Sequence, residues 1–178
     1  MGNVLSAGIG QAPARQAAIY AKIPTRVPAT TVSKVCGSGL QAILFGAKTI
    51  ALGDADIVVA GGMESMSNAP YYLTRARSGY RMGNGEIIDG MIHDGLWDPY
   101  GNFHMGNAGD KCAREYKFSR EAQDEFAKES FRRAVAAQRE GLFNAEIAPV
   151  SVAQKKGDAL VVKDDEGPPA GRPDKFAT

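Results

Sequence analysis

A cysteine placed between a predicted strand and a predicted helix constrains the fold of this chain more than any other feature. Residues 30–35 are rich in β-branched side chains and lead directly into Cys36, which is followed by Gly37-Ser38-Gly39. Apolar side chains recur at helical spacing over residues 40–50, and residues 57–60 form an uninterrupted apolar run, typical of a strand buried on both faces of a sheet. This stretch predicts a β-α-β unit with Cys36 at the turn into its helix.

Other local signals predict further elements on both sides of this unit. Pro13 is suited to the first position of a helix, and Ser119 is suited to cap one. A turn at Lys156-Gly157-Asp158 predicts a hairpin. The predicted elements are a strand at residues 4–7, a helix from Ala14 to Lys22, an irregular insertion over residues 68–103, a helix from Arg120 to Glu140, and hairpin strands at residues 147–152 and 159–162.

Charge and cysteine content exclude several classes of protein. The chain has 21 basic and 20 acidic residues and a formal net charge of +1, which does not suit a nucleic-acid partner. No apolar run approaches the ~20 residues that span a bilayer, so no membrane association is expected. Two cysteines in 178 residues indicate a reducing compartment, and we expect a cytoplasmic protein.

The setting predicted for Cys36 suits a nucleophile. The free N–H groups and the dipole at a helix N-terminus favour the thiolate form. Gly37 and Gly39 present no side chain and allow an acyl group to approach closely. The backbone N–H of Cys36 could also hold a developing oxyanion. The alternative is a buried cysteine that acts as a small hydrophobic residue, and both alternatives stay open because these residues identify no base.

Two stretches of the sequence resemble the signature stretches of the thiolase family. They are Val32-Ser33-Lys34-Val35-Cys36-Gly37-Ser38-Gly39-Leu40-Gln41-Ala42-Ile43 and Ala60-Gly61-Gly62-Met63-Glu64-Ser65-Met66-Ser67. The resemblance covers essentially the whole chain and is greatest to the acetyl-CoA acetyltransferases of that family. It implies that an acyl-CoA acylates Cys36 and that the acyl enzyme condenses with a second acetyl-CoA, or that a 3-ketoacyl-CoA is cleaved in reverse. Such a reaction belongs to fatty acid metabolism.

The resemblance also assigns binding residues. It implies that Leu96, His104 and Met105 lie against the pantetheine arm or the acyl chain, and that coenzyme A thioesters are substrates, with no permanently bound cofactor and no metal. His104-Met105-Gly106 favours a short-chain, acetoacetyl-CoA enzyme. His104 could instead be a surface or core histidine and Met105 a core residue. Cys112 lies in a predicted helix, and we expect it to pack there.

The resemblance implies a partial thiolase fold of the α/β class with an inserted α+β loop domain. Residues 1–67 would be a partial N-terminal α/β domain that carries the nucleophile, and residues 68–178 an incomplete loop domain. The family's catalytic histidine and second cysteine belong to a C-terminal half that is absent here, so we expect this chain alone to be inactive. The complete protein would be a homodimer or homotetramer. The alternatives are a longer-chain 3-ketoacyl-CoA thiolase and a non-catalytic protein that binds CoA esters or a thiolase subunit.

Overall fold

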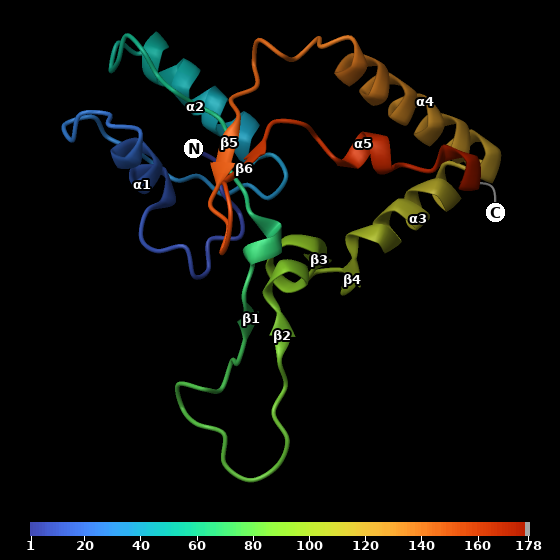
Figure 1. The fold of residues 1–178 in the computed structure, drawn as a ribbon. Helices are drawn as coiled ribbons and strands as arrows, with labels where there is room; N and C mark the ends of the chain where they lie inside the picture. The colour runs from blue at the N-terminus through green and yellow to red at the C-terminus, as the bar shows by residue number, and fades with distance from the viewer. Residues whose placement is uncertain (177–178) are drawn as a thin grey trace. The chain divides into compact units, whose positions relative to one another are not determined.

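The computed structural model describes residues 1–176, which belong to two compact units. The first unit spans Met1–Ala108, and the second begins at Gly109 (Figure 1). The boundary predicted after Ser67 divides the family's core domain from its loop domain, which is a different division from that into compact units. It stays a prediction. Within residues 1–176, no helix is both long enough and apolar enough to cross a membrane.

Both predicted helices of the first unit are confirmed. Helix α1 spans Pro13–Tyr20 and starts with proline, which lacks a backbone N–H. The loss costs little there, because an N–H at the first position of a helix has no acceptor within the helix. The helix ends before the predicted Lys22. Helix α2 spans Ser38–Ala51, and Gly53 beyond its end has a φ of 77°, which glycine adopts without strain.

Three extended segments meet at the centre of the first unit. Gly2 forms parallel β-bridges to Val32 on one side and to Gly62 on the other. The N–H of Gly2 donates to the carbonyl oxygen of Gly61 at 2.7 Å. The β-α-β connection predicted over residues 30–60 is therefore present in outline, but residue 2 lies between its two extended segments.

Two predicted strands are wrong because local contacts bend the chain. Residues 4–7 form no strand, since two successive backbone N–H groups of this segment donate to the Glu64 carboxylate at 2.8 and 3.0 Å. Residues 30–35 form isolated bridges only, and Val35 has a φ of 47°, a left-handed conformation that ends an extended segment.

Residues 57–60 also form no regular strand, and one side of this segment is uncovered. A Cβ atom at Gly46 of α2 would lie 2.9 Å from Cγ1 of Val58, so the helix packs closely on Val58. Successive side chains of an extended segment point to opposite sides, and Ile57 and Val59 are 85% and 77% exposed. The predicted burial on both faces is therefore wrong for this part of the chain.

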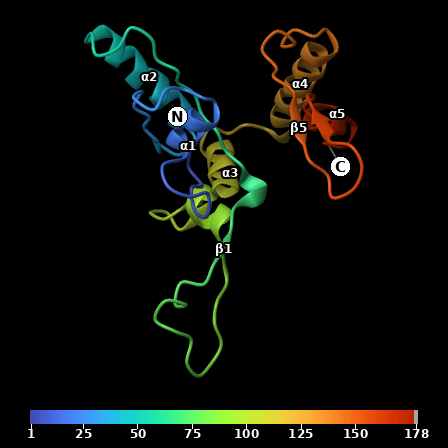
Figure 2. The same cartoon turned by 60° about the vertical axis from the view of Figure 1, so that its left-hand side comes forward.

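Residues 66–104 contain short elements and a long open loop. Strand β1 (Tyr71–Tyr72) pairs antiparallel with β2 (Ile88–Asp89), and the segment between them forms the loop seen in Figure 1 and Figure 2. The other elements are the 3-10 turn η1 (Met66–Asn68), the π-helical turn η2 (Ile92–Leu96), and the antiparallel strands β3 (Trp97–Asp98) and β4 (Phe103–His104). This agrees with the irregular character predicted for the region.

The second unit is built around a long helix. Helix α3 (Met105–Glu115) leads into it, and α4 spans Arg120–Arg139. Oγ of Ser119 accepts a hydrogen bond from the N–H of Ala122 at 3.2 Å, which confirms the predicted N-cap. The remaining elements are the predicted hairpin of β5 (Val150–Val152) and β6 (Leu160–Val162), the short helix α5 (Gly167–Ala170), and the turn η3 (Pro173–Lys175).

Few apolar side chains are buried among the described residues. The buried ones are Leu5, Ala14 and Ala42. On α2, Leu40 is 64% exposed and Ile43 is 50% exposed, although their helical spacing predicts a face turned towards a core. These two side chains of α2 are therefore at least half exposed within the first unit.

Candidate active site

Cys36 lies in the tight turn that leads into α2, one residue before the N-cap Gly37. The N–H of Gly37 donates to the carbonyl oxygen of Lys34, and the N–H of Ser38 donates to that of Val35, both at 3.1 Å. The side chain of Cys36 is exposed, and within residues 1–176 its own N–H has no acceptor in hydrogen-bonding geometry. The turn therefore presents both a thiol and a free N–H at the start of a helix.

The turn is strained at one residue and braced by another. Val35 has a φ of 47°, which is unfavourable for a β-branched side chain and of a kind that clusters at functional sites. The buried Ser38 braces this geometry: its Oγ accepts from the N–H of Lys34 at 2.8 Å and donates to the carbonyl oxygen of Val35 at 2.6 Å. The sequence analysis missed the roles of both residues.

Cys36 lines a cavity of about 410 Å³ in the first unit. Its walls come from the N-terminal segment, the turn before α2, the second signature stretch and the end of η2. The lining residues are Gly2, Asn3, Val4, Leu5, Val35, Cys36, Ser38, Gly39, Gly62, Met63, Glu64, Met66, Gly95 and Leu96. The structure thus brings Leu96 into the same cavity as Cys36.

His104 and Met105 are not among the residues that line this cavity. His104 pairs with Trp97, which follows Leu96 in the chain, so it lies close to one wall. Nδ1 of His104 accepts a hydrogen bond from the N–H of Gly106 at 3.0 Å, an arrangement that assigns the ring proton to Nε2. Met105 begins α3 and is 41% exposed. Their substrate contacts stay predictions.

Glu64 holds the N-terminal segment in place as part of the cavity wall. Its Oε1 accepts from the side-chain amide of Asn3 at 2.9 Å and from the N–H of Leu5 at 3.0 Å, and its Oε2 accepts from the N–H of Val4 at 2.8 Å. Both carboxylate oxygens are therefore engaged in fixing the wall. The sequence analysis missed this role, although Glu64 stands in the second signature stretch.

A hydrogen-bonded group lies at the π-helical turn that leads to Leu96. The hydroxyl of Tyr72 donates to Oδ2 of Asp94 at 2.5 Å, and Nδ1 of His93 lies 2.8 Å from Oδ1 of the same carboxylate. The hydrogen bond with His93, and then that with Tyr72, lowers the pKa of Asp94, while the bond to Asp94 raises the pKa of Tyr72. This group ties β1 to η2. Among residues 1–176, no three His, Cys, Asp or Glu side chains are grouped to hold a metal ion.

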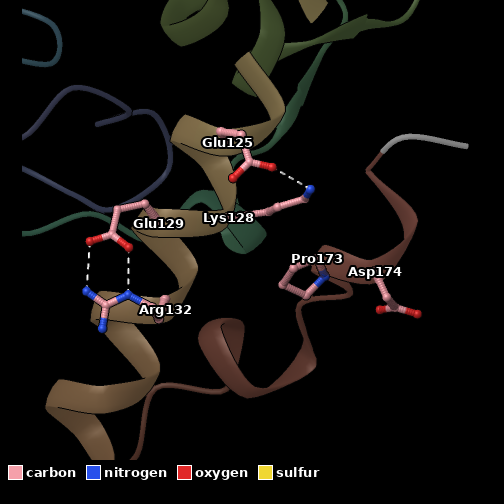
Figure 3. Close-up of a pocket in the computed structure, with 6 residues that line it drawn as sticks. All are labelled: Glu125, Lys128, Glu129, Arg132, Pro173 and Asp174. Carbon is pink, nitrogen blue, oxygen red and sulfur yellow. Dashed lines mark hydrogen bonds and ion pairs between the residues drawn. The ribbon is translucent and has the colours of Figure 1, made fainter. Parts of the chain in front are cut away.

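A second hollow, in the second unit, has a charged wall. Figure 3 shows Glu125 paired with Lys128, and Glu129 paired with Arg132, along α4, with Pro173 and Asp174 across from them. These pairs are between residues of the same helix, at 2.8 and 2.6 Å, so the charges on this wall largely neutralise one another. Cys112 lies within α3 as predicted, but it is exposed, so its predicted packing is wrong within the described chain.

The chain is similar to known thiolases along nearly its whole length. The family described as "Thiolase, N-terminal domain" matches residues 1–174. An acetyl-CoA acetyltransferase of Cupriavidus necator is 55% identical over 166 residues, which cover 93% of this chain and 42% of that protein. An acetyl-CoA acetyltransferase of Pseudomonas aeruginosa is 52% identical over 96% of this chain and 44% of its own length.

A solved structure shows the same fold. The crystal structure of a thiolase from Ascaris suum in complex with coenzyme A has a TM-score of 0.90 and 42% identity, and the match covers 99% of this chain and 44% of that one. The predicted α/β class and partial thiolase fold are thereby confirmed. The chain spans less than half the length of these relatives.

Proposed function

Because the chain belongs to the thiolase family, we propose that the complete protein containing it is an acetyl-CoA acetyltransferase, which forms or cleaves acetoacetyl-CoA. The observation that carries this proposal is the position of Cys36, exposed at the start of α2 in a cavity shared with Leu96. The named relatives at 55% and 52% identity support the short-chain assignment.

Cys36 performs the acyl transfer in this proposal. Its sulfur attacks the thioester carbonyl carbon of acetyl-CoA, and the bond from that carbon to the sulfur of coenzyme A breaks. The proton given up by the Cys36 thiol passes to the sulfur of the departing coenzyme A, which leaves as the free thiol. The acetyl group is then held as a thioester on Cys36. The free N–H of Cys36 stabilises the negative charge that develops on the carbonyl oxygen. The glycines at positions 37 and 39 leave space beside the sulfur.

The second half of the reaction needs groups beyond this cavity wall. Condensation requires a base that removes an α-proton from the second acetyl-CoA. Cys36 and Glu64 are the ionisable side chains among the residues that line the cavity, and Glu64 is engaged with three N–H groups. We therefore assign the base to other parts of the complete protein, in keeping with the catalytic histidine and second cysteine that the family resemblance implies.

Substrate contacts and assembly follow the same reasoning. We assign Leu96, His104 and Met105 to the pantetheine arm or the acyl chain of a coenzyme A thioester. Leu96 lines the cavity, and His104 is paired with its neighbour Trp97. The solved relative in complex with coenzyme A supports this substrate class. We also propose a cytoplasmic protein that works as a homodimer or homotetramer.

Thiolysis by the complete protein tests this function. We expect 3-ketoacyl-CoA substrates to be cleaved with the highest kcat/KM at the four-carbon length, followed by the loss of the substrate's enolate absorbance as coenzyme A is added. Cleavage of long-chain substrates alone would support a longer-chain 3-ketoacyl-CoA thiolase instead. Coenzyme A binding with no cleavage at any length would support the non-catalytic alternative.

A further inference from the structure

Asn3 carries an unpaired acceptor in the wall of the Cys36 cavity. Of the side-chain nitrogen and oxygen atoms buried within residues 1–176, Oδ1 of Asn3 is the one that has no hydrogen-bond partner. The residue is 4% exposed and lines the cavity together with Cys36. Buried polar atoms in native proteins are nearly always paired, so this one calls for a physical explanation.

The rest of the side chain fixes the position of this oxygen. Nδ2 of Asn3 donates to the carbonyl oxygen of Met63 at 3.0 Å and to Oε1 of Glu64 at 2.9 Å. Both partners are acceptors, so the amide cannot be flipped without placing oxygen against oxygen. Glu64 is itself held by two backbone N–H groups. The orientation of the carboxamide is therefore set by its surroundings.

An apolar side chain of similar size would avoid the cost of burying an acceptor with no partner. An oriented, unpaired acceptor on a residue that lines the cavity of a nucleophile is instead suited to a donor that arrives when the site is occupied. An N–H or O–H group meets this requirement. Two sources can supply it: an amide N–H of the pantetheine arm of the bound thioester, or a group of the complete protein, including an ordered water, that enters the same cavity.

We infer that Asn3 is a hydrogen-bond acceptor of the working Cys36 site, pairing through Oδ1 with an N–H or O–H donor in the cavity. This inference rests on the proposed function of Cys36 as the acyl carrier. It gives Asn3 a part in binding or positioning that goes beyond its contacts with Met63 and Glu64.

Two substitutions of similar size separate this role from a merely structural one. Asn3→Asp keeps an acceptor oxygen, whereas Asn3→Leu removes it, and both lose the donations from Nδ2. A purely structural role predicts that Asn3→Asp is at least as harmful, because it places a second carboxylate beside Glu64. We expect the opposite order in the complete protein: kcat/KM for thiolysis about tenfold or more below wild type in Asn3→Leu, and several-fold higher in Asn3→Asp than in Asn3→Leu.

A second background keeps the comparison valid if carboxylate repulsion unfolds the first variant. In Glu64→Gln protein, the carboxylate pair is absent, so charge repulsion no longer acts on Asn3→Asp. The same order of kcat/KM is expected there, with thermal unfolding used to confirm that each variant is folded. Equal kcat/KM for the two substitutions in this background, or wild-type kcat/KM in Asn3→Leu, overturns the inference.

The rise in Tm caused by coenzyme A identifies the source of the donor. If the ligand supplies it, this rise is smaller in Asn3→Leu than in wild type. If the protein or an ordered water supplies it, the rise is unchanged while kcat falls. Mass spectrometry of wild-type protein treated with acetyl-CoA tests the proposed function separately. If wild-type Cys36 takes no acetyl group, both the proposed function and the inference about Asn3 are overturned. Normal acetylation with no effect of Asn3→Leu overturns the inference alone.

Discussion

At the scale of single residues, the two cysteines offer an internal comparison. Both are exposed, so access of a reagent does not separate them. Cys36 stands just before the N-terminus of α2, while Cys112 lies inside α3, where the backbone N–H groups are used within the helix. In the complete protein, we predict that iodoacetamide at mildly acidic pH labels Cys36 faster, and that acetyl-CoA protects it. Peptide mass spectrometry measures both rates; equal labelling would contradict the assigned setting.

Substitution of each cysteine separates chemistry from stability. Cys36→Ala should abolish thiolysis while leaving the urea midpoint of the complete protein nearly unchanged, because an exposed thiol contributes little packing. Cys112→Ala is the matched control, with turnover retained and stability within about 0.5 kcal/mol of wild type, since Cys112 is also exposed. The proposed role is falsified if Cys36→Ala keeps substantial condensation activity.

The residues of the site differ in how far the sequence could predict them. Local signals placed Cys36 at the turn into a helix, namely nearby glycines and an apolar helix pattern, while its role as nucleophile came from the family resemblance and stays a prediction. Asn3 and Glu64 were missed because their contact joins residues 61 positions apart, and no local pattern reports such a pair. The resemblance suggested Leu96, which periodicity alone does not single out.

At the scale of elements, close approach at Gly2 holds the extended segments against α2. A Cβ atom at Gly2 would lie 2.6 Å from the nitrogen of Gly39, too close for van der Waals contact. We predict that Gly2→Ala destabilises the complete protein by about 1–3 kcal/mol. Gly109→Ala is the control, because nothing lies within 4 Å of the added atom and alanine favours α3 by about 0.5–1 kcal/mol. Urea unfolding compares them, and a Gly2→Ala protein as stable as wild type would refute the packing argument.

On α4, paired arginines change the titration of one carboxylate. Hydrogen bonds from Arg132, and then from Arg133, lower the pKa of Glu129 from 4.5 to about 2. Since the folded pKa lies below the unfolded value, this pairing stabilises the helix above about pH 4.5 and is lost as the pH falls towards 2. Replacing both arginines with glutamine should return the pKa towards 4.5, and added salt should raise it in wild type because the group is exposed. Carbon-13 NMR titration measures it; a wild-type midpoint near 4.5 would contradict the pairing.

The elements were predicted unevenly for a physical reason. The starts of α1 and α4 depend on Pro13 and Ser119, signals that lie within one turn of each helix. The predicted strands at residues 4–7 and 57–60 needed partners along their length, and in the described chain neither segment forms even a single bridge. The hairpin of β5 and β6 formed as predicted because the two strands are neighbours in the sequence and pair with each other across one connection.

At the scale of the whole molecule, the exposure of large apolar side chains, among them Ile57, Val59 and Leu40, is the dominant feature. These side chains are 85%, 77% and 64% exposed, on a chain that spans less than half of its curated relatives. Large apolar side chains left in solvent favour association and the binding of hydrophobic dyes. We therefore predict that the 178-residue chain by itself binds such a dye strongly and aggregates, whereas the complete protein binds little dye and forms only a defined oligomer.

Charged substitutions show whether these side chains are buried in the complete protein. Ile57→Glu together with Val59→Glu should reduce dye binding by the 178-residue chain, because they remove two exposed apolar side chains. The same pair should destabilise the complete protein by about 2 kcal/mol or more, because burying a carboxylate without a partner is costly. Met82→Gln is the control: Met82 is fully exposed in the open loop between β1 and β2, and a scattered surface residue should change neither property. Urea unfolding of the complete protein measures the loss of stability. If the doubly substituted protein is as stable as wild type, Ile57 and Val59 stay in solvent, and residues 57–60 are not a buried strand of the complete fold.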